Sequence, residues 1–160
     1  MSGVAIRSAS RADVGTILEL IRGLAEYEKL PHECVATEEK LLATLFGTKP
    51  AAEVLIATVD GTPAGFALFF HNYSTFLAKQ GIYLEDLFVK PDFRGKGIGK
   101  ALLVKLAAVA VERDCGRLEW SVLDWNKDAI RFYESLGAKA MDEWTVYRVT
   151  GEALMKLAKT

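Results

Sequence analysis

The stretch "DFRGKGIGKALL", residues 92–103, decides the fold of this 160-residue chain. Its three glycines stand two residues apart among one arginine and two lysines, and the sequence then becomes apolar. The preceding residues 82–89, "IYLEDLFV", have the β-prone pattern of a strand, which Lys90 and Pro91 end. After the glycines, apolar residues recur at helical spacing at Ile98, Leu102, Leu106 and Val109. The sequence therefore predicts a sharp turn that leads from a strand directly into a long helix.

Two familiar phosphate-binding loops do not fit this glycine pattern. A Walker A loop needs four residues between its glycines and then Lys-Ser/Thr, whereas Gly95 and Gly99 are one residue too close and Ala101 replaces the hydroxyl. The dinucleotide fingerprint needs a glycine where Lys100 stands. Backbone N–H groups at the start of a helix still converge on an anion, assisted by the helix dipole. The loop therefore predicts a metal-free pyrophosphate site, and the alternative is a glycine-rich turn without a ligand.

The rest of the chain alternates between strand and helix patterns. Further strands are expected at Val4–Arg7, 53–59, 66–70, 118–123 and 144–149. Helices are expected from Ser10 to about Glu28, from Thr37 to about Gly47, from the glycine loop to about Asp114, and from Asn126 to about Leu136, with a terminal helix or tail after residue 150. This order predicts the α/β class with a mixed central sheet.

Composition narrows the class of protein. Hydrophobic residues make up 51% and charged residues 26% of the chain, so we expect residues 1–160 to form one globular domain. The formal net charge is −1 and the basic residues are spread along the chain, so no nucleic acid is expected as a partner. No stretch resembles a signal peptide or a membrane helix, which predicts a cytoplasmic protein without a membrane partner. Cys34 and Cys115 are too few for a metal cluster or a disulfide framework.

Three blocks of the sequence resemble one known family in their order and spacing. They are "IRSASRADVGTILELIRGLAEYE" near the start, "YLEDLFVKPDFRGKGIGKALL", and "DWNKDAIRFYESLGA". Together they resemble the GNAT family of N-acetyltransferases, in particular its spermidine/spermine (diamine) and thialysine N-acetyltransferase branch. The resemblance implies the GNAT fold, with a mixed sheet of about six to seven strands splayed between the fourth and fifth, and about four flanking helices. It also implies a homodimer and direct, metal-free transfer of an acetyl group from acetyl-CoA to a primary amine.

The resemblance also implies which residues bind acetyl-CoA. The strand before the glycine loop would offer main-chain groups to the pantetheine arm, the loop would hold the pyrophosphate, and the helix that starts at Asn126 would contact the cofactor from the other side. These residues are Leu87, Phe88 and Val89 on the strand, Arg94, Gly95, Lys96, Gly97, Ile98, Gly99 and Lys100 in the loop, and Asn126, Lys127, Asp128, Ala129 and Tyr133 near that helix. From the sequence pattern alone, Asn126 is equally well a helix N-cap.

Acetyl transfer to an amine needs a base and an acid. A lysine-like amine has a pKa near 10.4, so at neutral pH it is mostly ammonium and must lose a proton before it attacks. By resemblance, Glu85 takes that proton, directly or through water, and Tyr133 protonates the departing thiolate. Strand alternation predicts that Glu85 and Leu87 share one face and that Asp86 lies on the opposite face. The alternatives are a solvent-facing carboxylate at Glu85 and a packing tyrosine at Tyr133.

The identity of the acceptor stays open at this point. By resemblance, the residues that would bind a cationic amine are Tyr27, Glu28, Glu85, Glu119, Trp120 and Ser121. A polyamine or diamine and a lysine-like amino acid such as thialysine both fit these residues. Acetylation of a protein lysine or N-terminus is a third enzymatic possibility. Outside the enzymes, the alternative is a non-catalytic module of the same fold that senses acetyl-CoA.

Overall fold

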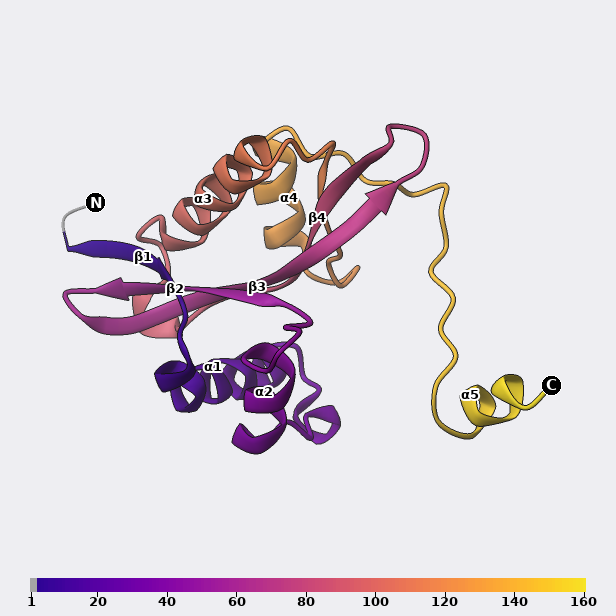
Figure 1. Cartoon of the computed structure of the whole chain (residues 1–160). Coiled ribbons are helices and arrows are strands. Elements are labelled where there is room, and N and C mark those ends of the chain that lie inside the picture. The colour runs from indigo at the N-terminus through magenta and orange to yellow at the C-terminus, as the bar shows by residue number, and fades with distance from the viewer. Residues whose placement is uncertain (1–2) are drawn as a thin grey trace. The chain divides into compact units, whose positions relative to one another are not determined.

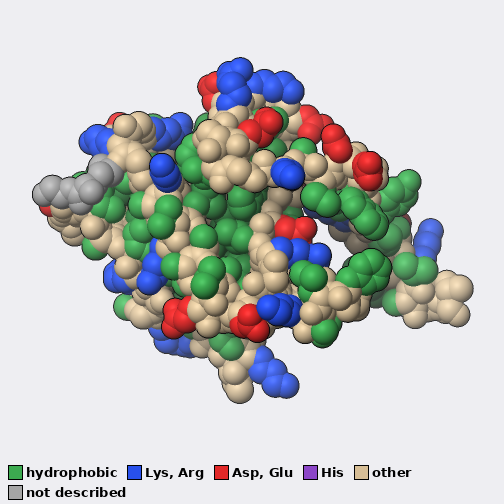
Figure 2. All heavy atoms as spheres, turned by 90° about the horizontal axis from the view of Figure 1, so that it is seen from above, with side chains coloured by type: hydrophobic (Ala, Val, Ile, Leu, Met, Phe, Trp, Pro, Cys, Tyr) green, Lys and Arg blue, Asp and Glu red, His purple; other side chains and the backbone are tan. Residues whose placement is uncertain are grey.

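The computed structural model describes residues 3–160 of the chain (Figure 1). The chain forms two compact units, one that ends at Ser121 and one that runs from Val122 to Thr160. The single domain expected from the sequence stays a prediction. Figure 2 shows basic and acidic side chains interspersed on the face drawn, in keeping with the formal net charge of −1.

The first unit contains most of the regular structure. Its elements are, in chain order, β1 (Val4–Ser8), α1 (Val14–Tyr27), α2 (Glu38–Leu45), β2 (Glu53–Val59), β3 (Thr62–Ser74), β4 (Lys79–Val89), α3 (Ile98–Glu112) and β5 (Leu118–Trp120). Short 3-10 helices occupy Arg11–Asp13, Pro31–Glu33 and Pro91–Phe93. The strands form one five-stranded sheet in the order β1-β2-β3-β4-β5, in which only the β4–β5 pair is parallel. The predicted α/β class with a mixed sheet is confirmed.

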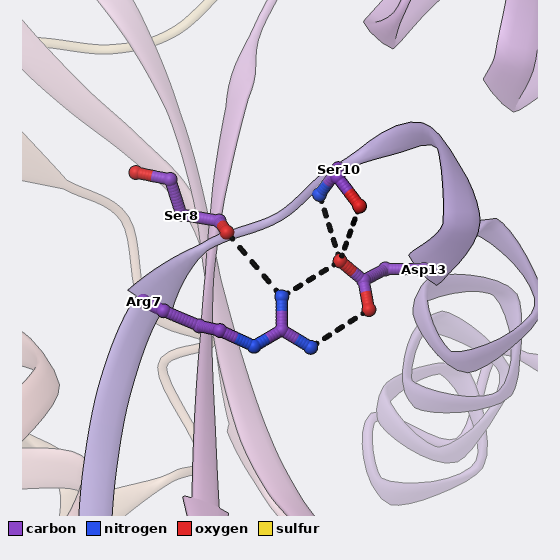
Figure 3. A network of polar contacts seen from close by, with 4 residues as sticks. All are labelled: Arg7, Ser8, Ser10 and Asp13. Carbon is purple, nitrogen blue, oxygen red and sulfur yellow. Dashed lines mark hydrogen bonds and ion pairs between the residues drawn. The ribbon is translucent and has the colours of Figure 1, made fainter.

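A charged network joins the first strand to the first helix (Figure 3). Arg7 of β1 donates two hydrogen bonds of 2.8 Å to the carboxylate of Asp13, which also accepts one of 2.7 Å from the backbone N–H of Ser10. These bonds favour the ionised carboxylate, so the pKa of Asp13 lies well below its usual range, with the hydrogen bond from Arg7 as the largest cause. The helix expected to start at Ser10 begins as a 3-10 turn, and α1 itself starts at Val14.

Helices cover both faces of the sheet. Figure 1 shows α1 and α2 on one side of the strands and α3 on the other. On the side of α1, both helices share a buried cluster with three strands, whose members are Ile17, Leu18, Leu20, Leu24, Leu41, Leu45, Val54, Ile56, Phe66 and Phe88. On the other side, α3 buries Ile98, Leu102 and Leu106. The packing assigns each strand side chain to one of these two faces.

The second unit contains two helices, α4 (Lys127–Ser135) and α5 (Gly151–Ala158), and no strand. The strand expected at residues 144–149 is wrong for the described chain. A strand needs a neighbour with which to exchange backbone hydrogen bonds, and this segment has none among the described residues, so Val146 is 82% and Tyr147 is 91% exposed. The strand expected at 118–123 is also shorter, Leu118–Trp120. The sheet therefore has five strands, fewer than the six to seven expected, while the fold agrees.

Candidate active site

The parallel pairing of β4 with β5 ends halfway along β4, where β5 itself ends. Its register joins Ile82 to Leu118, Tyr83 to Glu119 and Leu84 to Trp120, and no further pair follows. Residues 86–89 of β4 pair with β3 alone, and Glu85 has no partner in either pairing. From residue 85 to residue 89, the backbone groups on the edge away from β3 therefore have no strand partner among the described residues. Such an edge can bind an extended chain through main-chain hydrogen bonds. The pairing ends at the place where the splay between the fourth and fifth strands is expected.

The end of β5 is fixed beside this opening by a side-chain contact. The hydroxyl groups of Tyr83 and Ser121 lie 2.5 Å apart and share a hydrogen bond. Glu119 forms an ion pair of 3.0 Å with Arg117 and accepts a 3.0 Å hydrogen bond from Asn72. The carboxylate of Glu119 is therefore already balanced by a neighbouring cation, which weakens the expectation that it binds a cationic acceptor.

The glycine loop has the backbone that its sequence requires. Gly95 and Gly97 have φ values of +76° and +79°, in the left-handed region where residues with a Cβ are strained. Gly97 is the N-cap of α3, and the first α-helical hydrogen bond runs 2.9 Å from the N–H of Ala101 to its carbonyl. The N–H groups of residues 98–100 therefore lack helical acceptors.

The glycine loop is not crowded at Gly95. A Cβ atom built on Gly95 would meet no heavy atom within 4 Å. The helix dipole and nearby Lys96 and Lys100 favour negative charge at this position. The residues present thus fit the diphosphate group of acetyl-CoA.

Arg94 connects this loop to the end of α1. Its Nε donates a 2.9 Å hydrogen bond to the carbonyl of Val89, the last residue of β4. Its guanidinium carbon lies 4.8 Å from the centre of the Tyr27 ring and 5.5 Å from that of the Phe88 ring. Phe88 is buried in the core, so it can offer only its main chain to a ligand on the open edge. Tyr27, expected to bind the acceptor, therefore lies directly beside the cofactor loop.

A β-bulge at Glu85 changes the faces predicted for β4. Leu68 of β3 lies opposite Asp86, but its neighbour Phe69 lies opposite Leu84, so Glu85 is an extra residue in β4. Leu68 packs on the cluster under α1, which places Asp86 on the α1 face. The bulge interrupts the strict period of two on which the predicted faces of Glu85 and Asp86 depend, so the relative face of Glu85 stays a prediction.

Three carboxyl groups, at the end of α1 and on β4, lie close enough to one another to interact electrostatically. The pKa of Glu28, the C-cap of α1, is raised by burial and by the negative charge of Glu85. The pKa of Asp86 is raised to about 7 by burial, by Glu85 and by Glu28. The group therefore combines negative potential with one carboxyl that gains or loses a proton near neutrality.

Asp86 is a residue beside the candidate site that the sequence did not single out. The sequence did place Glu85 and Asp86 next to each other, but alternation assigned them to opposite faces. The bulge leaves no mark in the pattern of apolar residues, so only the pairing with β3 shows it.

The remaining predicted residues lie on α4, in the second unit. Asn126 is the N-cap of this helix and accepts a 3.3 Å hydrogen bond from the N–H of Ala129. Lys127 and Asp128 form its first turn, and Asp128 also pairs with Arg131 at 2.7 Å. The ring of Tyr133 lies 5.6 Å from that of Phe132, centre to centre. The cap interpretation of Asn126 is confirmed, while its contact with a cofactor and the role of Tyr133 stay predictions.

Comparison with known proteins identifies the family. The acetyltransferase (GNAT) family matches residues 18–138. The chain belongs to this family. Thialysine N-epsilon-acetyltransferase of Bos taurus is 43% identical over 169 residues, covering 99% of each chain. L-ornithine N5-acetyltransferase of Arabidopsis thaliana is 38% identical over 199 residues, covering 96% of this chain and 87% of the relative.

The GNAT fold is also found among solved structures. An integron cassette protein from the mobile metagenome of V. cholerae superposes with a TM-score of 0.82 and 30% identity over the full length of both chains. The relatives and the family match identify this GNAT protein as an N-acetyltransferase that acts on amine acceptors. Its described residues contain no helix that is long and apolar enough to span a membrane.

Proposed function

We propose that this acetyltransferase moves the acetyl group of acetyl-CoA directly to the side-chain amine of a small lysine-like amino acid. The observation that carries the proposal is the open edge of β4 from residue 85 to residue 89, which leads into the glycine loop and lies beside three carboxyl groups. The substrate class is supported by the relatives, since thialysine and ornithine are both amino acids with a side-chain amine. A polyamine or diamine is the second acceptor class that the same carboxylates fit.

In this proposal the first unit binds the co-substrate in two places. The pantetheine arm has amide groups that can pair with the free backbone edge of residues 87–89, as an added strand would. The diphosphate would accept hydrogen bonds from the N–H groups of residues 98–100 and from the terminal nitrogens of Arg94. Lys96 and Lys100 add positive charge there. By family resemblance, residues 126–129 would contact the cofactor from α4.

The acceptor enters as a cation and leaves as an amide. The ammonium group would be attracted by Glu28, Glu85 and Asp86, and it would give a proton to one of the two carboxylates on β4, directly or through water. The free amine then attacks the thioester carbon, so that an N–C bond forms and the C–S bond breaks. Tyr133 would donate its proton to the departing sulfur and regain one from the nitrogen of the new amide, through water.

Asp86 is suited to the first of these proton transfers. Its pKa of about 7 makes it a stronger base than an ordinary aspartate, while much of it is still ionised at neutral pH. Glu85 and Glu28 raise that pKa because their negative charges disfavour a second one nearby. The arrival of a cationic amine would favour the ionised carboxylate, which is the form that accepts the proton.

We also propose that the protein is a homodimer in which a second copy covers the extended segment before α5. Trp144, Val146 and Tyr147 are largely exposed, and apolar side chains this exposed favour a contact with another surface. Light scattering coupled to gel filtration tests this proposal, because a mass near 35 kDa, twice the 17.6 kDa of one chain, is expected.

Release of free CoA thiol tests the proposed activity. The protein is incubated with acetyl-CoA and, separately, thialysine, lysine, ornithine, spermidine or a lysine-containing peptide. We expect turnover with the amino acids and a lower kcat/KM with spermidine. Tight CoA binding without turnover of any amine would instead support the acetyl-CoA sensor, and a preference for the peptide would support a protein acetyltransferase.

A further inference from the structure

Arg94 belongs to both halves of the proposed site. Through its hydrogen bond to Val89 it is fixed to the end of β4, and through Gly95 it continues into the glycine loop. Its guanidinium carbon is 4.8 Å from the centre of the Tyr27 ring, within the ~6 Å range of a cation–π interaction. A single side chain therefore joins the loop that would bind the diphosphate to the residue that would bind the amine.

We propose that Arg94 is a positioning residue that couples the binding of CoA to the binding of the amine acceptor. The inference rests on the proposed function, because it assigns the diphosphate to the glycine loop and the amine to the end of α1. A guanidinium group binds a ring through its face and an anion through the N–H groups at its edge. The two interactions use different parts of the group, so Arg94 can make both at once.

Binding of the diphosphate would restrain the plane of the guanidinium and, with it, the Tyr27 ring. Tyr27 is the last residue of α1, and Glu28 directly follows it. The negative charge of Glu85 helps to raise the pKa of Glu28. The amine would therefore meet an end of α1 that is already ordered, and less of its binding energy would be spent on ordering it. Because coupling between two ligands is reciprocal, the amine must raise the affinity for CoA by the same factor.

Helix α1 also contacts the second ring beside the Arg94 guanidinium, that of Phe88. Phe88 lies under the same guanidinium, at 5.5 Å, and it packs closely on α1 at Gly23. A Cβ atom on Gly23 would come within 2.9 Å of the Phe88 ring. Glycine at this position thus lets α1, β4 and the loop meet around Arg94, whereas a larger residue would push Phe88 away.

Calorimetric titration of CoA in the absence and presence of saturating thialysine measures the coupling. CoA carries no acetyl group, so the ternary complex forms without turnover. For the unaltered protein we expect thialysine to lower the Kd of CoA about two- to fivefold, the factor that corresponds to an exposed cation–π contact. In Arg94→Lys, which keeps the charge but loses the planar face, and in Tyr27→Leu, we expect this ratio to fall to about one.

Two variants separate coupling from simple loss of binding. Tyr27→Phe keeps the ring, so the ratio of the Kd of CoA without thialysine to its Kd with thialysine should stay the same as in the unaltered protein. Lys96→Met should weaken CoA binding but leave the ratio unchanged, because Lys96 lies over Phe93, at 5.6 Å, and not over a residue of α1. A ratio of one in the unaltered protein, or the same ratio in Arg94→Lys and Tyr27→Leu, would overturn the inference while leaving the proposed function intact. Absence of any CoA binding would overturn both.

Discussion

Replacing Asp86 by asparagine removes a carboxyl group whose pKa is shifted toward neutrality by folding. In the folded protein its pKa is raised from 3.8 to about 7, mainly by burial and then by the charges of Glu85 and Glu28. The unfolded chain ionises this carboxyl near pH 4, whereas the folded chain holds the proton until about pH 7. Between these values the folded state binds more protons, so its free energy of unfolding falls as the pH rises. The Asp86→Asn variant lacks this contribution and keeps a similar side-chain volume.

The size of the effect follows from the two pKa values. Each pH unit inside the window changes the free energy of unfolding by up to ~1.36 kcal/mol, so between pH 5 and pH 7 the contribution of Asp86 falls by about 2 kcal/mol. Above about pH 8 the contribution of Asp86 to the free energy of unfolding no longer changes with pH. Relative to the unaltered protein, Asp86→Asn should therefore gain about 2 kcal/mol of stability over this interval.

Urea unfolding at pH 5, 6, 7 and 8 measures the difference between the two proteins. Comparing differences cancels the contributions of groups that do not interact with Asp86. Asp92→Asn, which removes an exposed carboxyl from the loop after β4, controls for the loss of one surface charge. If the difference between Asp86→Asn and the unaltered protein is the same at pH 5 and pH 7, Asp86 is not a buried carboxyl with a raised pKa, and its proposed role as a base loses its support.

Three further predictions concern the loop, the acid and the first helix. Gly97→Ala places a Cβ where φ is +79°, so we expect the Kd of CoA to rise about tenfold, measured by calorimetry; an unchanged Kd would show that this backbone does not bind the diphosphate. Tyr133→Phe should lower kcat on the order of a hundredfold with little change in the Kd of CoA, and intact turnover would refute the general-acid assignment. Asp13→Asn should lower the free energy of unfolding at pH 7 by about 1–2 kcal/mol, because Arg7 loses its ionised partner. The pKa of Asp13 is depressed, so this stabilisation is present above about pH 4 and is lost as the pH falls further; a difference that persists unchanged at pH 2 would contradict the ion pair.

Local signals explain why the centre of the fold could be predicted from the sequence. The strand at 82–89, the glycines and the apolar spacing from Ile98 follow one another directly, and the structure contains β4, the loop and α3 in that order. The left-handed backbone at Gly95 and Gly97 is likewise a property of a short segment. Each of these features depends on neighbours within a few residues.

Pairing between distant segments explains what the sequence did not predict. The apolar, β-prone residues 144–149 have the composition of a strand, but a strand also requires a partner, and the described chain supplies none. The bulge at Glu85 depends on how β3 lies against β4, and the sequence of β4 alone is compatible with either register. For the same reason the sequence did not single out Asp86, because its raised pKa depends on burial and on Glu28 at the end of α1 as well as on its neighbour Glu85.

A crystal structure of the protein with CoA tests the central claim most directly. We predict that the diphosphate oxygens accept hydrogen bonds from the N–H groups of residues 98–100, and that the pantetheine amides pair with the backbone of β4 between residues 85 and 89. The sulfur should then lie close to Glu85 and Asp86. CoA bound elsewhere, or a β4 edge occupied by side chains of the protein itself, would contradict the account.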